Sequence, residues 1–179
     1  FVGTDIDKKS LEIAEKIINK NNLSKFIQLK QQMDATQVFK GILNDADKFS
    51  ATMCNPPFYK SQEEAMQANA RKLEGLGISD AVATRNFSGT QQELWYKGGE
   101  KAFLHTYLYE SSQFKTQCFW YTSLVSKKEN VQSMYDSLTK LGATAIKTIP
   151  MRQGNKATRI VAWTFLTDAE QKKWSAALA

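Results

Sequence analysis

Two patterns of hydrophobic and polar residues alternate along this chain: short apolar runs, and apolar residues that recur every three or four positions. Short apolar runs predict strands at residues 1–6, 26–30, 49–54 and 117–125. Apolar residues spaced by three or four positions predict helices at 8–20, 100–114 and 128–141. Residues 34–47 are expected to form a short helix and a loop. Strands and helices that alternate in this way predict an α/β fold around a parallel sheet.

The C-terminal part of the chain departs from this alternation. Gly142 is expected to end the helix at 128–141, and residues 144–149 and 160–165 then predict two strands. The loop between them, Pro150 to Arg159, is too short for a parallel crossover, so the two strands should be antiparallel. Between residues 59 and 99 the periodic pattern gives way to polar residues, glycines and scattered bases. We expect this stretch to be an insertion outside the sheet.

Composition indicates one globular domain without a membrane anchor. The chain has 179 residues, of which 42% are hydrophobic and 23% charged, and we expect residues 1–179 to form a single domain. No apolar run is long enough to span a membrane and no secretory signal is visible, so a cytoplasmic protein is expected. The net charge of +6 favours a polyanionic partner, but only weakly.

Metal and disulfide chemistry find little support in the sequence. Cys54 and Cys118 both fall within predicted strands, where they are best interpreted as small buried hydrophobic residues. His105 is the one histidine of the chain, which excludes a multi-histidine metal site. We therefore expect no metal.

The run Cys54-Asn55-Pro56-Pro57-Phe58 follows the predicted strand 49–54, where α/β folds place their ligand sites. An exocyclic amine is a weak nucleophile, and acceptors for its two hydrogens help to activate it. The Asn55 side-chain oxygen and the Pro56 carbonyl are such acceptors, the prolines fix the backbone, and Phe58 can stack on a base. The alternative is an ordinary Asn-Pro turn. The motif suits adenine N6, guanine N2 or a glutamine amide, with a methyl group supplied by S-adenosylmethionine.

Several residues are candidates for the cofactor site. Asp5 ends the first strand, where such folds place an acid against ribose hydroxyls, whereas Asp7 is more simply the N-cap of the helix at 8–20. Asp34 and Ala35 either bound the cofactor adenine or form an ordinary connection, and Asn55 is assigned to the cofactor site as well. The glycine-rich loop of a class I S-adenosylmethionine-dependent methyltransferase would follow a strand before Phe1. We therefore expect a Rossmann-like sheet truncated at its N-terminus, without that first strand and loop.

Five ordered blocks of sequence resemble one known family. The blocks are Phe1 to Asp5, Cys54 to Phe58, Asn86 to Glu100, Trp120 to Ser126, and Gln153 to Phe165. From Phe1 to about Lys173 the chain resembles the large-subunit ribosomal RNA adenine-N6 methyltransferase F family, related to the human methyltransferase-like RNA adenine methylases. Ser88 departs from the family pattern, where a glycine is expected.

The resemblance implies a reaction, a partner and a set of site residues. The reaction would be methyl transfer from S-adenosylmethionine to N6 of one adenine in 23S ribosomal RNA, by a monomer. Asn55, Pro56, Pro57 and Phe58 would form the catalytic tetrad, and Asp5 would bind the cofactor ribose. Two alternatives stay open: a guanine-N2 or protein-glutamine methyltransferase with the same motif, and an RNA-binding fragment without catalysis.

RNA-binding residues are predicted in the insertion and in the C-terminal loop. The insertion 59–99 is interpreted as a mobile lid or an RNA-contacting wing. Its bases, together with three bases of the loop 150–159, are expected to contact phosphates, and two aromatic residues to stack on bases. These residues are Lys60, Arg71, Lys72, Arg85, Arg152, Lys156 and Arg159, with Phe87 and Trp95. Alternatively, the bases form a solvated face and the aromatic residues attach the insertion to the core.

Overall fold

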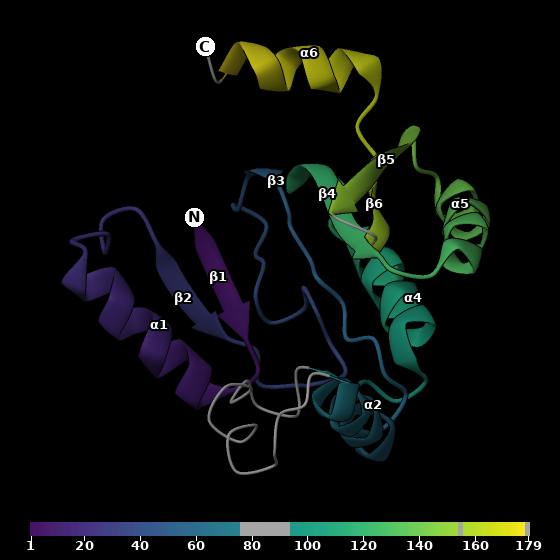
Figure 1. Ribbon diagram of the computed structural model, residues 1–179. Helices are drawn as coiled ribbons and strands as arrows, with labels where there is room; N and C mark the ends of the chain where they lie inside the picture. The colour runs from purple at the N-terminus through teal and green to yellow at the C-terminus, as the bar shows by residue number, and fades with distance from the viewer. Residues whose placement is uncertain (76–93, 154–155, 178–179) are drawn as a thin grey trace.

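Two sheets organise the protein in the computed structural model, which describes residues 1–75, 94–153 and 156–177. In the first sheet, β1 (Val2–Asp5) pairs in parallel with β2 (Gln28–Gln31). The second sheet has the order β3-β4-β6-β5, with bounds β3 (Phe49–Ala51), β4 (Cys118–Val125), β5 (Ala145–Gln153) and β6 (Lys156–Thr164). There β3 and β4 are parallel, while β6 is antiparallel to both β4 and β5. The predicted α/β fold with a C-terminal antiparallel pair is confirmed (Figure 1).

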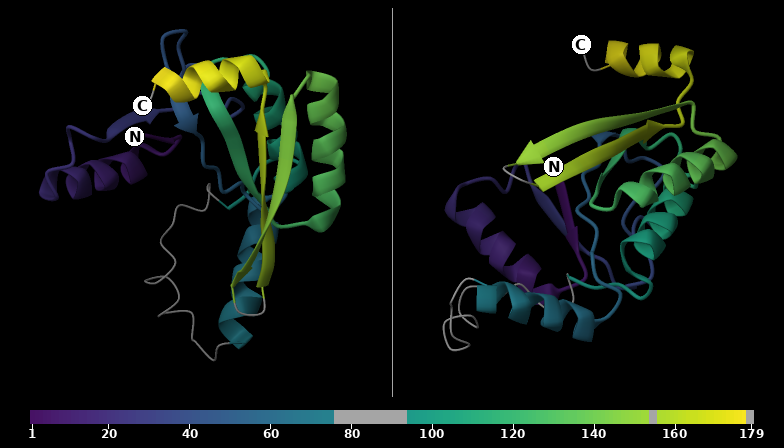
Figure 2. Two further views of the ribbon diagram at one scale, coloured as in Figure 1. Left: turned by 90° about the horizontal axis from the view of Figure 1, so that it is seen from above. Right: turned by 45° about the vertical axis from the view of Figure 1, so that its right-hand side comes forward.

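Helices cover the two sheets unequally. The described helices are α1 (Lys8–Lys20), α2 (Gln62–Gly75), α4 (Gly99–Ser111), α5 (Lys128–Leu141) and α6 (Asp168–Ala177). Helix α1 lies along the two-stranded sheet, and we call β1, β2 and α1 the two-stranded region (Figure 1). Helices α4 and α5 contact each other beside the larger sheet, and we call β3 to β6 with α4 and α5 the four-stranded region (Figure 2).

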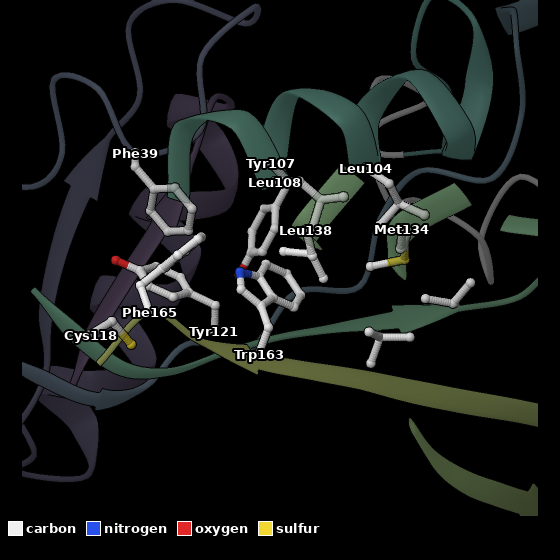
Figure 3. Close-up of a cluster of buried hydrophobic side chains, with 12 residues drawn as sticks. Phe39, Leu104, Tyr107, Leu108, Cys118, Tyr121, Met134, Leu138, Trp163 and Phe165 are labelled. Carbon is white, nitrogen blue, oxygen red and sulfur yellow. The ribbon is translucent and has the colours of Figure 1, made fainter. Parts of the chain in front are cut away.

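The hydrophobic core lies between α4, α5 and the larger sheet. Figure 3 shows aromatic rings from α4, β4 and β6 gathered around Trp163, which is fully buried. The Trp163 ring stacks on Tyr121 at a centroid distance of 6.0 Å and meets Tyr107 edge-on at 5.5 Å. Its indole N–H donates to the Ser111 hydroxyl at 3.1 Å. The dense contact between helix and sheet fixes the four-stranded region as one body.

The ends of two helices match the sequence prediction. Helix α1 begins after Asp7, whose carboxylate accepts the N–H groups of Lys9 and Ser10 at 3.2 Å each, so the predicted N-cap is confirmed. Helix α5 ends at Gly142, which has φ +85° in the left-handed region that favours glycine. Both helices have the predicted bounds.

Two predictions were wrong: the helix within residues 34–47 and the loop at 150–159. Residues 34–47 form turns instead of a helix, because the Glu110 carboxylate takes the N–H groups of Val38, Phe39 and Lys40 at 3.0, 2.7 and 3.0 Å. The predicted loop 150–159 is mostly strand, since β5 and β6 stay paired as far as Gln153 and Lys156.

Two helices were not expected. Helix α2 lies within the predicted insertion, and α6 follows the last strand. Within the described residues, no helix is both long and apolar enough to cross a membrane. Cys54 and Cys118 are free thiols, as predicted.

Candidate functional site

The Asn-Pro-Pro-Phe motif (Asn55–Phe58) lies directly beyond the carboxyl end of β3. Pairing with β4 continues past the last residue of β3, since Thr52 N–H donates to the Trp120 carbonyl and Leu124 N–H to the Cys54 carbonyl, both at 2.9 Å. Asn55 is exposed, whereas the next residue, Pro56, is fully buried. The motif therefore presents one amide to solvent from a backbone that is anchored in the sheet.

A group of three hydroxyl side chains lies just before the motif. The Thr52 hydroxyl is 2.7 Å from the Tyr107 hydroxyl, which donates to the Thr122 carbonyl at 3.1 Å. Thr122 in turn donates its N–H to the Thr52 hydroxyl at 3.1 Å and its own hydroxyl to the Thr52 carbonyl at 2.6 Å. We call Thr52, Tyr107 and Thr122 the hydroxyl bridge. It ties β3, β4 and α4 together three residues before Asn55.

Groups beside the motif are neutral at ordinary pH. Burial raises the pKa of the Cys54 thiol to about 12, against a partial lowering by a hydrogen bond to Ser123. Burial also raises the pKa of Tyr107 well above its usual value. Neither the thiol nor the phenol can therefore act as an anionic nucleophile or base here.

The chain after the motif is held by residues that follow the insertion. Phe58 and Tyr59 both donate their N–H groups to the Leu94 carbonyl, at 3.2 and 3.1 Å, and Tyr59 forms a bridge with Trp95. Trp95 is half-buried, and its buried indole N–H has no hydrogen-bond partner among the described residues. Trp95 thus lies beside the motif and is attached to the segment that follows it.

Gly99 explains the close approach at the start of α4. Its φ is +71°, and a Cβ there would lie 2.9 Å from the Lys60 side chain. A glycine is therefore required both by the backbone conformation and by the space. The contact places the beginning of α4 against the turn that follows the motif.

Three of the four residues predicted to bind the cofactor, Asp5, Asp34 and Ala35, lie at the carboxyl end of the two-stranded sheet. Asp5 is half-buried and accepts the Asp7 N–H at 2.8 Å through one carboxylate oxygen. Gln32 N–H donates to the Asp5 carbonyl at 2.9 Å, and the Gln32 side chain accepts the Asp34 N–H at 3.0 Å. Asp5 and Asp34 are thereby brought to the same end of the sheet, with exposed Ala35 beside Asp34. Asn55 lies beyond the end of β3 of the other sheet, and no hydrogen bond links it to either carboxylate within the described residues.

Hydrogen bonds within its own loop orient the Asp34 carboxylate. Its carboxylate accepts the Thr36 hydroxyl at 2.6 Å and the Thr36 N–H at 2.8 Å. These hydrogen bonds, the hydroxyl first, lower the pKa of Asp34, so the group is a carboxylate at neutral pH. This turn also fits the alternative interpretation of an ordinary connection.

Within the described part of the structure, three of the nine residues predicted to bind RNA are exposed, and they lie on separate segments. Lys60 and Arg71 are exposed after the motif and on α2, and Arg152 is exposed on β5. Lys72 and Lys156 belong to α2 and β6 by their backbone, and their side chains are outside the described part of the structure. Two further predicted residues lie outside the described residues altogether: Arg85 and Phe87.

Arg159 has a structural contact that the sequence did not indicate. It is half-buried and donates through Nη1 to the Ser126 carbonyl at 3.2 Å, next to the end of β4. The Ser126 N–H donates to the buried Glu100 carboxylate at 2.6 Å. The loop after β4 is therefore held from both sides.

Two buried carboxylates on α4 were missed by the sequence interpretation. Glu100 and Glu110 are 1% and 3% exposed, and each accepts three N–H donors from distant segments. The available signal was two acids on the apolar face of a predicted helix, where solvated charges are unexpected. In the described residues, no group of histidine, cysteine, aspartate and glutamate side chains could hold a metal ion.

Comparison with known proteins places the chain in a family. A family model described as RNA methyltransferase matches residues 1–167. The chain belongs to the RNA methyltransferase family. Ribosomal RNA large subunit methyltransferase F of Shewanella oneidensis is 44% identical over 185 residues, which cover 99% of this chain and 51% of the relative. The protein of the same name from Flavobacterium psychrophilum is 47% identical over 176 residues, covering 97% and 56%.

Solved structures agree with this assignment. The hMettl16 catalytic domain, in complex with MAT2A 3′UTR hairpin 1, matches 94% of this chain and 56% of its own length. Its sequence identity is 25% and its TM-score 0.73. The Rossmann-like fold of S-adenosylmethionine-dependent methyltransferases is thereby established for this member of the RNA methyltransferase family. The chain spans about half the length of the curated relatives it matches.

Proposed function

We propose that this chain carries the catalytic site of an enzyme that methylates the N6 amine of an adenine in 23S ribosomal RNA. The observation that carries the proposal is the Asn-Pro-Pro-Phe motif, which presents an exposed Asn55 from an anchored strand end. Membership of the RNA methyltransferase family supports the reaction class. The relatives named ribosomal RNA large subunit methyltransferase F support the substrate class.

Each residue of the motif has a separate proposed role in activating the amine. The Asn55 side-chain oxygen and the Pro56 carbonyl accept the two hydrogens of N6, which favours tetrahedral geometry and frees the nitrogen lone pair. Pro56 is buried and Pro57 half-buried, so the acceptors keep their place. The half-buried Phe58 offers its ring to the base.

S-adenosylmethionine, when bound, supplies an electrophilic methyl group on a sulfonium. With that group bound, the amine nitrogen held by Asn55 and Pro56 would take the methyl group, the carbon–sulfur electron pair would stay on sulfur, and one N6 proton would pass to water. Cys54 and Tyr107 are neutral and do not supply an anionic base beside the motif. Positioning is therefore the main contribution of the protein.

The two-stranded region fits the cofactor through Asp5, Asp34 and Ala35. One oxygen of Asp5 accepts the Asp7 N–H, and its second oxygen makes no hydrogen bond to the described residues, so it can accept from a ribose hydroxyl. Asp34 and Ala35, at the same end of the sheet, are proposed to border the adenine. Asn55 would meet the cofactor from the opposite side.

RNA binding is proposed to involve exposed bases around the motif. Lys60, Arg71 and Arg152 are exposed, and the chain has a net charge of +6. Segment 59–99 is proposed to act as a lid or RNA-contacting wing, and Lys72, Arg85, Lys156 and Phe87 are proposed as further RNA contacts. Arg159 and Trp95 are half-buried, so they are proposed to contact RNA only through the exposed part of each side chain. The protein is proposed to act as a monomer in the cytoplasm, where ribosomal RNA is found.

Mass spectrometry of nucleosides tests the proposal. The protein in its full length is incubated with S-adenosylmethionine and unmodified 23S ribosomal RNA, and the RNA is then digested to nucleosides. N6-methyladenosine is the expected product. N2-methylguanosine, or methylglutamine in added ribosomal protein, would replace the proposed substrate by one of the alternatives. RNA binding without any methylated product would reject the enzyme altogether.

A further inference from the structure

The ladder between β3 and β4 changes immediately before the Asn-Pro-Pro-Phe motif. In a regular parallel ladder, Thr122 N–H would donate to the Thr52 carbonyl, between the two bonds at Trp120 and Cys54. Instead, Thr122 N–H donates to the Thr52 hydroxyl, and the Thr122 hydroxyl donates to the Thr52 carbonyl. The hydroxyl oxygens of Thr52 and Thr122 thus take the place of one backbone hydrogen bond, that from Thr122 N–H to the Thr52 carbonyl. Like a β-bulge, which interrupts a ladder with an extra residue and re-aims nearby side chains, this interruption sets how the chain leaves the sheet toward Asn55.

The Tyr107 hydroxyl completes this arrangement from the helix side. It donates its one proton to the Thr122 carbonyl, so it must accept the proton of the Thr52 hydroxyl, which itself accepts Thr122 N–H. The Thr52 and Tyr107 hydroxyls therefore each have a fixed donor and a fixed acceptor. Tyr107 is 2% exposed and cannot exchange these partners for water.

A tyrosine elsewhere in the same core lacks this connection. Tyr121 is also buried and also stacks near Trp163, as Figure 3 shows, but its hydroxyl donates to the Phe114 carbonyl after α4. The hydroxyls of Tyr107 and Tyr121 thus both have hydrogen-bond partners in the core. Of the two, Tyr107 contacts the segment that leads from β3 to the motif.

We propose that Tyr107 is a positioning residue for methyl transfer, which aims Asn55 at the amine through the hydroxyl bridge. This inference rests on the proposed function and adds a residue outside the motif. Without the Tyr107 hydroxyl, the Thr52 hydroxyl loses its acceptor, and the ladder can return to the regular bond between Thr122 N–H and the Thr52 carbonyl. Asn55 and the Pro56 carbonyl then shift together relative to the reacting carbon.

The test compares Tyr107→Phe with Tyr121→Phe in the full-length protein, since each removes one buried hydroxyl from the same core. We expect Tyr107→Phe to lower kcat about 10-fold to 100-fold, the range for a small misplacement of reacting groups. KM for RNA and for S-adenosylmethionine should stay within about twofold, because the binding surfaces are unchanged. Tyr121→Phe should leave kcat within about twofold. Equal kcat values in the two variants would overturn the inference.

A double-mutant cycle with Thr52→Val provides the second readout. If Tyr107 acts through Thr52, the double variant should lose no more kcat than the more impaired single variant. Multiplicative losses would also overturn the inference, since they would mean two independent effects. If Tyr107→Phe does not fold, the comparison of Thr52→Val with Tyr121→Phe carries the same test. An inactive wild-type protein would instead reject the proposed function, which keeps the two failures distinct.

Discussion

The two regions of this protein hold their functional residues in different ways. In the four-stranded region, Trp163 and Leu138 are fully buried, and the motif is fixed by contacts with residues tens of positions away. In the two-stranded region, α1 buries only Ile18, while Ile17 is 57% exposed. Asp7 and Asp34 are there oriented by residues two or three positions away. The proposed amine side of the site is therefore held by the core, and the proposed cofactor side by local turns.

One side chain joins these two kinds of structure. Glu110, on α4, accepts the N–H groups of Val38, Phe39 and Lys40, which belong to the loop after β2. The same loop begins with the turn at Asp34. Through this contact, the core of the four-stranded region holds the loop that forms the proposed cofactor side.

The largest expected difference between the regions is in stability. Trp163→Ala should lower the free energy of unfolding by about 3–5 kcal/mol, because it opens a cavity among fully buried rings. Ile17→Ala should cost less than about 1 kcal/mol, since more than half of that side chain is already exposed. Urea denaturation measures both. Equal losses would show that the two regions do not differ in this way.

A smaller effect is expected at the contact between the regions. Glu110→Ala leaves three N–H groups without their acceptor and should cost about 2 kcal/mol of unfolding free energy. Hydrogen exchange should become faster at Val38, Phe39 and Lys40. Glu100→Ala is the matched control, because Glu100 also accepts three N–H donors but holds the loop after β4. Unchanged exchange at Val38 to Lys40 in Glu110→Ala would contradict the proposed link.

The smallest effect is a local response to acid in the two-stranded region. The Ser10 hydroxyl, followed by backbone N–H groups, lowers the pKa of Asp7 below 3.8. Because the folded pKa is lowered, the cap stabilises α1 above pH 3.8 and is lost as the pH falls through the lower folded value. The amide signals of Lys9 and Ser10 in NMR should titrate with a midpoint below 3.8. Asp7→Asn keeps a capping oxygen and should abolish the titration, and a midpoint at or above 3.8 would refute the cap's effect.

The sequence predicts those features whose causes are local. Helices α1 and α5 were predicted with their observed bounds, because spacing, Asp7 and Gly142 all lie within the segments concerned. The place of the motif after a strand was likewise visible in the chain. Helix α6 had a local signal too, since Thr167 and Glu170 form a capping box with Thr167 N–H bound to Glu170 at 2.7 Å.

Features with distant causes were not predictable in this way. Residues 34–47 form turns instead of a helix because of Glu110, and the segment before the motif is held by Tyr107. Each of these side chains is more than 50 positions away in the sequence. The length of the hairpin from β5 to β6 depends on pairing, which lets basic residues with weak strand signals extend both strands. The motif could be found from the sequence, and the side chains that aim it could not.

The most direct test of the account is the kinetics of Asn55→Ala in the full-length protein, with S-adenosylmethionine and 23S ribosomal RNA. Asn55 is exposed and supports no other segment in the described residues, so the melting temperature should not change. We predict that kcat falls by about 10²–10³-fold, as when a preorganised polar contact to the reacting group is removed. The dissociation constant for S-adenosylmethionine should rise by a much smaller factor than kcat falls, because Asn55→Ala removes one proposed cofactor contact while Asp5 and Asp34 remain in place. Undiminished formation of N6-methyladenosine by a folded Asn55→Ala protein would contradict the central claim.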